Sequence, residues 1–259
     1  MPIFPSHIPY ELRIGWRYTR AARSTRRNGF ISFISGVSML GIALGVAALI
    51  IVLSVMNGFQ KEVRDRMLGV VSHIEVYSAT GALPDAQDTM RQARAHPEVA
   101  GAAPFISTQA LVARGEDMKG ALVRGIDPAL EPQVTDLAAG AQQTVLAQLV
   151  PGGFGVVLGG ELARSMGVRA GELVTLIAPG GQVTPAGVVP RLKQMTVVGT
   201  FESGHYEYDS TLVFVHIEDA QRLFRLEGPS GVRLRLRDLQ QARSVARDLS
   251  ARLGADLYV

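Results

Sequence analysis

The richest cluster of side chains that could do chemistry lies at residues 202–209, with the sequence ESGHYEYD. It brings one histidine close to three carboxylates, which are ligand types that zinc uses. Extended backbone would place His205, Glu207 and Asp209 on one face. Because the spacing matches no metal-ligand or acid–base pattern, we interpret the segment as a polar turn leading into an apolar strand. We therefore predict no metal site and no catalytic residue.

The motifs of several enzyme classes are missing from the sequence. None of the three lysines (Lys61, Lys119 and Lys193) follows a glycine, so there is no Walker A loop and ATP has no site in this chain. None of the five histidines precedes a glutamate, which excludes the H-E-x-x-H zinc helix. There is no Gly-x-Ser-x-Gly elbow and no cysteine. We expect a non-enzymatic chain without a cofactor of its own.

The basic residues are unevenly distributed along the chain. Residues 1–27 contain six arginines and one acidic residue, whereas the remainder contains 20 basic and 22 acidic residues. Nucleic-acid binding relies on clustered lysine and arginine on a folded surface. The sequence therefore argues against a nucleic-acid partner and assigns the high isoelectric point to a short basic head.

An uncharged run of 33 residues follows that head, at residues 28–60. About 20 apolar residues cross the hydrocarbon layer as a helix, so this run is long enough to span a membrane. A cleaved signal peptide would have an apolar region of only about 7–15 residues. We predict a retained transmembrane helix at 28–60, a cytoplasmic basic and interfacial segment at 1–27, and an exported domain at 61–259, because arginines stay on the cytoplasmic side.

Two features of the predicted span concern its neighbours. Gly41 and Gly45 form a G-x-x-x-G pair, which either marks a helix-packing face or reflects the ordinary glycine content of membrane helices. A second set of residues shares one face near the exported end and either lines an apolar cavity or contacts lipid and other helices. This set is Val52, Val55, Met56 and Phe59.

The rest of the chain alternates short strands with short helices, which predicts a mixed α+β body with two lobes. In residues 232–237, arginine alternates with valine and leucine, as expected for a half-exposed strand. Helices are predicted at 84–95, 159–166, 218–224 and 239–253. Strands are predicted at 73–77, 99–105, 109–113, 121–124, 154–158, 173–177, 194–201, 211–216 and 232–237.

One segment, residues 178–192, does not suit a packed core. Its sequence APGGQVTPAGVVPRL contains three prolines, three glycines and three valines. Proline lacks a backbone donor and is confined to sheet edges, so we predict a projecting hairpin, called the arm below. The arm either recognises a partner or is simply a long surface loop.

Four stretches of this sequence resemble the lipoprotein-releasing permeases of the Lol C/E-type family. They are residues 12–18 (LRIGWRY), 30–35 (FISFIS), 41–46 (GIALGV) and 53–59 (LSVMNGF). The arm is also similar to the hook hairpin of the C-type subunit, through TPAGVVPR at residues 184–191.

This resemblance implies one N-terminal transmembrane helix, then a two-lobed periplasmic domain with porter-like and sabre-like parts and a projecting β-hairpin. It implies an inner-membrane ABC complex in which a cytoplasmic ATPase binds ATP and mechanically drives two permease subunits, same or related. The complex extracts lipidated outer-membrane lipoproteins and passes them to a periplasmic carrier. Val52, Val55, Met56 and Phe59 would line the acyl-chain cavity. The carrier would contact Pro179, Gln182, Val183, Thr184, Pro185, Ala186, Gly187, Val188, Val189, Pro190 and Arg191.

The family has four membrane helices and this sequence contains one, so we expect it to be the N-terminal part of a longer permease. Two alternatives remain open. One is an efflux-type permease of the same mechanotransmission class, and the other is a single-span anchored adaptor that only binds a periplasmic partner.

Overall fold

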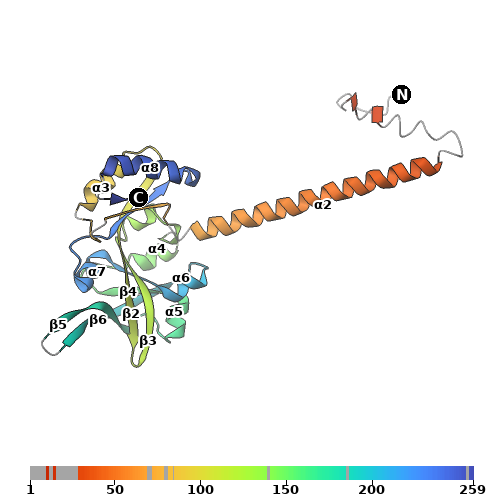
Figure 1. Ribbon diagram of the computed structural model, residues 1–259. Helices are drawn as coiled ribbons and strands as arrows, with labels where there is room; N and C mark the ends of the chain where they lie inside the picture. The colour runs from red at the N-terminus through yellow and green to blue at the C-terminus, as the bar shows by residue number, and fades with distance from the viewer. Residues whose placement is uncertain are drawn as a thin grey trace. The chain divides into compact units, whose positions relative to one another are not determined.

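The computed structural model (Figure 1) describes residues 10–11, 14–15, 29–68, 72–78, 81–83, 85–138, 141–184, 187–254 and 257–259. The chain divides into two compact units, Met1–Val63 and Arg64–Val259. The predicted fold class, an apolar N-terminal helix followed by a mixed α+β domain, is confirmed.

The described part of the first unit consists mainly of residues 29–63 of one long helix, α2 (Gly29–Leu68). Within it, the 28 residues Phe33–Gln60 are long and apolar enough to cross a membrane. At about 1.5 Å per residue, they exceed the roughly 30 Å of the hydrocarbon layer by several residues. The helix does not stop where the apolar run ends but continues for two further turns through charged residues.

The first lobe of the second unit is a four-stranded antiparallel sheet covered by two helices. Its strands have the order β2-β8-β1-β9, and α3 and α8 each connect two of them. This is a split βαβ arrangement, in which Met90 of α3 and Leu249 of α8 pack against Val76 and Leu234 of the sheet. The elements are β1 (Ile74–Ser78), α3 (Ala86–Arg94), β2 (Val99–Arg114), β8 (Gly231–Leu236), α8 (Ala242–Leu253) and β9 (Leu257–Tyr258).

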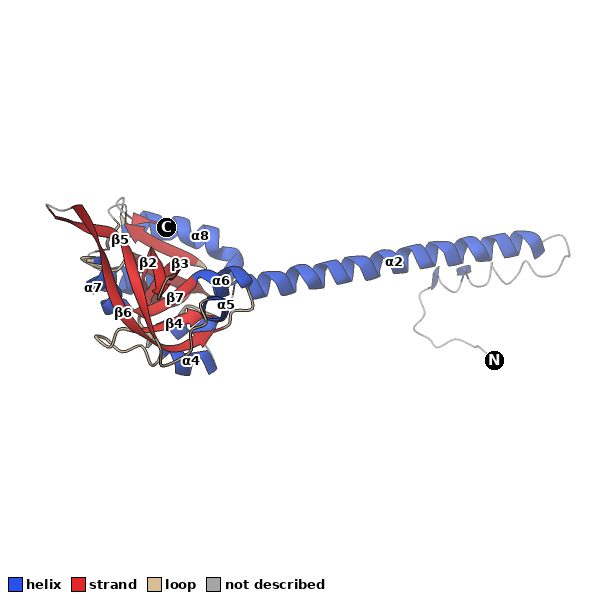
Figure 2. Ribbon diagram, turned by 90° about the horizontal axis from the view of Figure 1, so that it is seen from below, coloured by secondary structure: helices blue, strands red, loops and turns tan. Residues whose placement is uncertain are grey.

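The second lobe is inserted between β2 and β8. Its described strands run in the order β3-β7-β4-β6-β5-β2, and the pairing of β2 with β3 closes them into a barrel. Figure 2 shows the strands gathered centrally with helices around them. The elements are β3 (Asp117–Ile126), α4 (Ala141–Leu146), β4 (Gly155–Gly159), α5 (Gly160–Ser165), β5 (Leu173–Thr184), β6 (Gly187–Phe201), α6 (Tyr206–Thr211), β7 (Leu212–His216) and α7 (Ile217–Phe224). Three 3₁₀ turns, η2 (Glu131–Gln133), η3 (Asp136–Ala138) and η4 (Leu239–Gln241), complete the described elements.

Strand β2 belongs to both lobes. Residues 99–105 pair with β8, and residues 105–114 pair with β3, so the two ladders meet at Phe105. The prediction of two separate strands at 99–105 and 109–113 was therefore wrong. The intervening Ile106, Ser107 and Thr108 are strand-compatible, and their pairing with β3 keeps the backbone extended.

The contact between β4 and α6 depends on a glycine. Gly159 ends β4 and precedes α5, and a Cβ added there would overlap the backbone oxygen of Asp209. We expect Gly159→Ala to lower the free energy of unfolding by about 1–3 kcal/mol, as overpacking does. Gly120→Ala is the control, because among the described atoms nothing lies within 4 Å of its added Cβ. Thermal unfolding of both variants of this chain tests the prediction, and equal stabilities would contradict it.

Candidate functional site

The arm is a two-stranded β-hairpin formed by the ends of β5 and β6. Gly181 pairs with Pro190, Gln182 with Val189, and the ladder continues to Thr184 and Gly187. Figure 1 shows these strand ends extending beyond the rest of the second unit. The predicted projecting hairpin is confirmed. Residues 185 and 186, between the strands, lie outside the described residues, as do the side chains of residues 182–188.

The arm leaves the barrel because of its glycine and proline residues. Among the described residues, β2 pairs with β5 only at Thr175–Ile177, and the β5–β6 register shifts between Ala178 and Gly181. An extra residue in one strand bends the strand and increases its twist. Pro179 lies within this irregularity and Pro190 opposite its end, where the absence of an N–H disfavours a third strand.

Side chains attach the root of the arm to the body. The Arg191 guanidinium donates to the backbone oxygen of Phe224 at 3.4 Å, and Lys193 lies 3.7 Å from the centroid of the Phe154 ring. The Phe154 loop is held in turn by Asp219, whose carboxylate accepts from the N–H groups of Gly152 and Phe154 at 2.8 and 2.9 Å. Arg191, which was predicted to contact the carrier, thus anchors the arm to α7.

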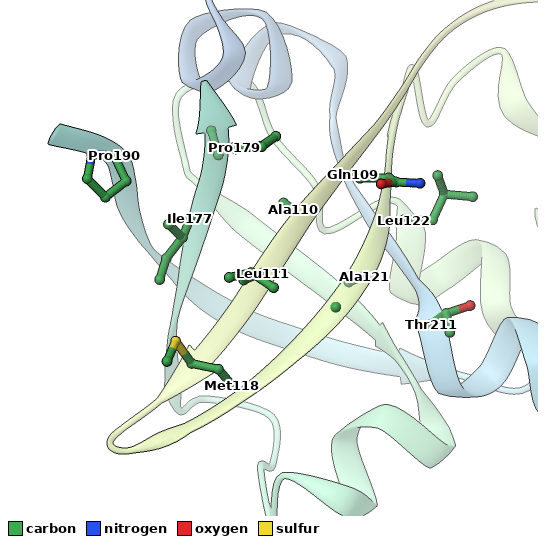
Figure 3. Close-up of a pocket in the computed structure, with 12 residues that line it drawn as sticks. Gln109, Ala110, Leu111, Met118, Ala121, Leu122, Ile177, Pro179, Pro190 and Thr211 are labelled. Carbon is green, nitrogen blue, oxygen red and sulfur yellow. The ribbon is translucent and has the colours of Figure 1, made fainter. Parts of the chain in front are cut away.

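An apolar groove of about 900 Å³ lies at the same root (Figure 3). Leu111 and Met118 from the β2–β3 hairpin flank it, while Ile177, Pro179 and Pro190 come from β5 and β6. The sequence predicted that Pro179 and Pro190 belong to a partner-binding arm, but it did not indicate that they lie beside the β2–β3 hairpin. The complete lining is Gln109, Ala110, Leu111, Met118, Gly120, Ala121, Leu122, Ile177, Ala178, Pro179, Pro190 and Thr211.

The candidate residues on α2 lie in the other unit. All of them are exposed, and within each of the two sets spacings of three or four residues place the members on one face of the helix. An added Cβ at either glycine of the G-x-x-x-G pair would meet nothing within 4 Å among the described atoms outside its own helix backbone. Their predicted roles in an acyl-chain cavity and in helix packing remain predictions. These residues are Val52, Val55, Met56 and Phe59, with Gly41 and Gly45.

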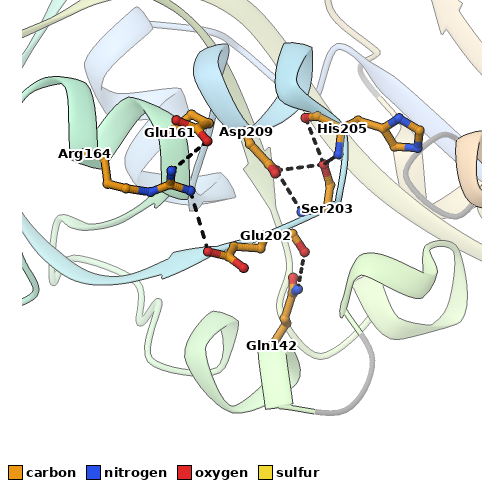
Figure 4. Close-up of polar contacts among 7 residues, drawn as sticks. All are labelled: Gln142, Glu161, Arg164, Glu202, Ser203, His205 and Asp209. Atoms are coloured by element: carbon orange, nitrogen blue, oxygen red, sulfur yellow. Dashed lines mark hydrogen bonds and ion pairs between the residues drawn. The ribbon is translucent and has the colours of Figure 1, made fainter.

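The polar cluster at 202–209 forms a hydrogen-bonded turn that leads into α6 (Figure 4). Asp209 accepts from the hydroxyl and the N–H of Ser203, both at 2.7 Å, and the Ser203 hydroxyl accepts from the N–H of His205 at 3.1 Å. The segment was interpreted as a polar turn before an apolar strand, and a short helix, α6, occupies residues 206–211 between this turn and β7. Within the described residues, no group of three or more acidic or histidine side chains could hold a metal ion.

A buried ion pair was missed by the sequence analysis. Arg233 of β8 pairs with Glu131 of η2, and both side chains are only 1% exposed. The prediction that residues 232–237 form a half-exposed strand was therefore wrong at Arg233. The guanidinium also lies 5.6 Å from the centroid of the Phe105 ring. Glu131 is 102 positions away in sequence, so no local pattern indicates the pairing.

Burial lowers the pKa of two further ionisable groups, Arg124 and His73. Burial, reinforced by the positive charge of Arg233, lowers the pKa of Arg124 to about 10. Burial, with Arg235 second, also lowers the pKa of His73. A neutral His73 suits its contact, in which Nδ1 accepts from the N–H of Leu236 at 3.0 Å. Both side chains belong to the second unit, and neither lies in the arm.

The structure thus joins an apolar helix that is long enough to cross a membrane to a mixed α+β domain. A family model described as MacB-like periplasmic core domain matches residues 35–252, and the chain belongs to this family. An apolar helix joined to such a domain fits an inner-membrane protein with a periplasmic domain.

Curated relatives make the comparison more specific. The lipoprotein-releasing system transmembrane protein LolC of Xylella fastidiosa is 45% identical over 251 residues, which cover 97% of this chain and 60% of that protein. LolC of Neisseria meningitidis serogroup B is 46% identical over 233 residues, covering 90% of this chain and 55% of that protein. These relatives confirm the resemblance to the Lol C/E-type family. The chain spans about 60% of the length of the first of them.

Among solved structures, the extracellular domain of the ABC-type transporter YknZ from Gram-positive bacteria aligns with a TM-score of 0.46 and 14% identity. The alignment covers 72% of this chain and 98% of that one.

Proposed function

We propose that this chain is part of an ABC permease that releases lipoproteins from the inner membrane. Helix α2 anchors it with the N-terminus in the cytoplasm, as the six N-terminal arginines favour, so the second unit is periplasmic. The permease itself is non-catalytic. A separate cytoplasmic ATPase supplies the energy, and a second permease subunit faces α2 across a cavity for acyl chains. The identity to LolC proteins over nearly the whole chain supports this proposal.

The arm is the structural feature that supports a docking site for a partner protein. It projects as a two-stranded ladder, its root is attached to α7 and to the Phe154 loop, and Val189 near its end is 53% exposed. A hairpin that is already ordered loses little conformational entropy when a partner binds. We propose that a periplasmic lipoprotein carrier docks on the arm.

The test is titration of the full chain, held in bilayer discs, with the purified periplasmic lipoprotein carrier. Replacing residues 180–191 by a short Gly-Ser turn should abolish binding. Val189→Asp should weaken it at least tenfold, because a buried unpaired charge opposes docking. Gln148→Asp, which adds the same charge at an exposed position after α4, is the matched control and should bind like the unmodified chain.

Two outcomes would contradict the docking proposal. The first is unchanged binding after replacement of the arm, which would place the carrier elsewhere. The second is no binding by any form, which would favour the efflux-type permease or the anchored adaptor. In either case the fold and the family assignment would stand.

A further inference from the structure

The groove at the root of the arm has walls from two hairpins. Register places Gln109 opposite Leu122 and Leu111 opposite Gly120, so these four residues lie on the outer face of the β2–β3 ladder. Leu111 is 43% exposed and Met118 is 59% exposed, which leaves large apolar side chains in contact with water. Contiguous exposed apolar surface of this kind marks a site of interaction.

The floor of the groove is open at Gly120. An added Cβ there would meet nothing within 4 Å among the described atoms, and its backbone conformation is not in the left-handed region. The glycine therefore contributes space to the groove rather than a special turn. Any larger residue at this position would project into the groove without straining the backbone.

The chemistry of the lining selects the ligand. Of the described residues that line the groove, none is charged, and only Gln109 and Thr211 have polar side chains. A peptide segment would bury N–H and C=O groups, which is costly without hydrogen-bond partners. A hydrocarbon chain has no such groups, and a groove of about 900 Å³ is within the usual size range of ligand sites.

We propose that this groove holds an acyl chain of a lipid-modified protein during its transfer. The inference rests on the proposed function, which brings such a protein to the arm. Met118, Leu111 and Ile177 contact the chain, and Gly120 leaves room for it. The groove lies outside the predicted membrane span, so it would shelter hydrocarbon that has left the bilayer.

The experiment uses the full chain in bilayer discs and a triacylated lipopeptide with a diazirine at the end of one acyl chain. After irradiation, adducts are mapped by peptide mass spectrometry. We expect adducts within residues 109–122 and 177–190. Gly120→Trp should reduce them at least tenfold by filling the groove, whereas Ser250→Trp on the exposed face of α8 should not. Adducts that are absent from the groove, or unchanged in Gly120→Trp, would overturn the inference.

A second variant guards against misfolding of the first. Met118 is exposed, so Met118→Glu should fold normally and still oppose a hydrocarbon ligand by placing a carboxylate in the groove. Competition with unlabelled lipopeptides gives an independent readout. Each buried methylene should strengthen binding by up to about fourfold, so longer acyl chains should compete better. Chain-length-independent competition would contradict the proposal.

Two further measurements distinguish the possible sources of the acyl chain and separate this inference from the docking proposal. A phospholipid with the same photoreactive chain should give few groove adducts, and equal labelling would overturn the assignment to a lipid-modified protein. Carrier titration is read separately. Normal carrier docking without groove adducts would overturn only this inference, whereas groove adducts without carrier docking would support it and overturn only the docking proposal.

Discussion

Glu131→Gln is expected to lower the free energy of unfolding by about 3–5 kcal/mol, because it leaves the buried Arg233 guanidinium without its counter-charge. The loss should be large since Arg124, which is half-buried, places a second positive charge near Arg233. Both lobes should be affected, because Arg233 lies on β8 and Arg124 on β3, and both strands pair with the shared strand β2. Chemical denaturation of the full chain, followed by circular dichroism, measures the effect.

The matched control removes an exposed ion pair from the same region. Arg235 and Asp136 approach to 2.7 Å, but their side chains are substantially exposed. Asp136→Asn should therefore cost no more than about 1 kcal/mol. The double variant Glu131→Leu with Arg233→Met should recover most of the lost stability, because well-packed apolar residues can replace a buried pair. Equal losses in Glu131→Gln and Asp136→Asn would refute the account of a buried pair.

Asp219→Ala is the second substitution with a large expected effect, about 2–5 kcal/mol. It removes the acceptor of two backbone N–H groups, those of Gly152 and Phe154, and each half-buried donor left unsatisfied costs about 1–3 kcal/mol. The loop that it holds carries the Phe154 ring beneath Lys193 at the root of the arm. We therefore expect weaker carrier binding as well as lower stability. Denaturation and carrier titration of the same variant measure both.

Glu161→Ala provides the comparison for this substitution. Glu161 forms an i,i+3 pair with Arg164 on the surface of α5, and its loss should cost less than about 1 kcal/mol and leave carrier binding unchanged. If Asp219→Ala lowers stability but binds the carrier normally, the Phe154 loop does not position the arm.

The sequence by itself determined the features that depend on local composition. A 33-residue uncharged run has one structure that satisfies its backbone groups in lipid, a helix, and the helix is present at Gly29–Leu68. The prolines and glycines of residues 178–192 likewise excluded a place inside the sheet, and these residues form the projecting hairpin. Both outcomes follow from the chemistry of the segment alone.

Only the tertiary structure decided which distant segments meet. The alternation in residues 232–237 predicts two faces of a strand but does not say which residues cover each face. The residue that pairs with Arg233 is Glu131 of η2, which belongs to the second lobe. The groove is likewise lined mainly by short runs from two hairpins about fifty residues apart, and no local pattern indicates that these hairpins lie together. Burial and pairing across such separations depend on contacts between distant strands, such as β2 with β5 and β2 with β8, which local propensity does not encode.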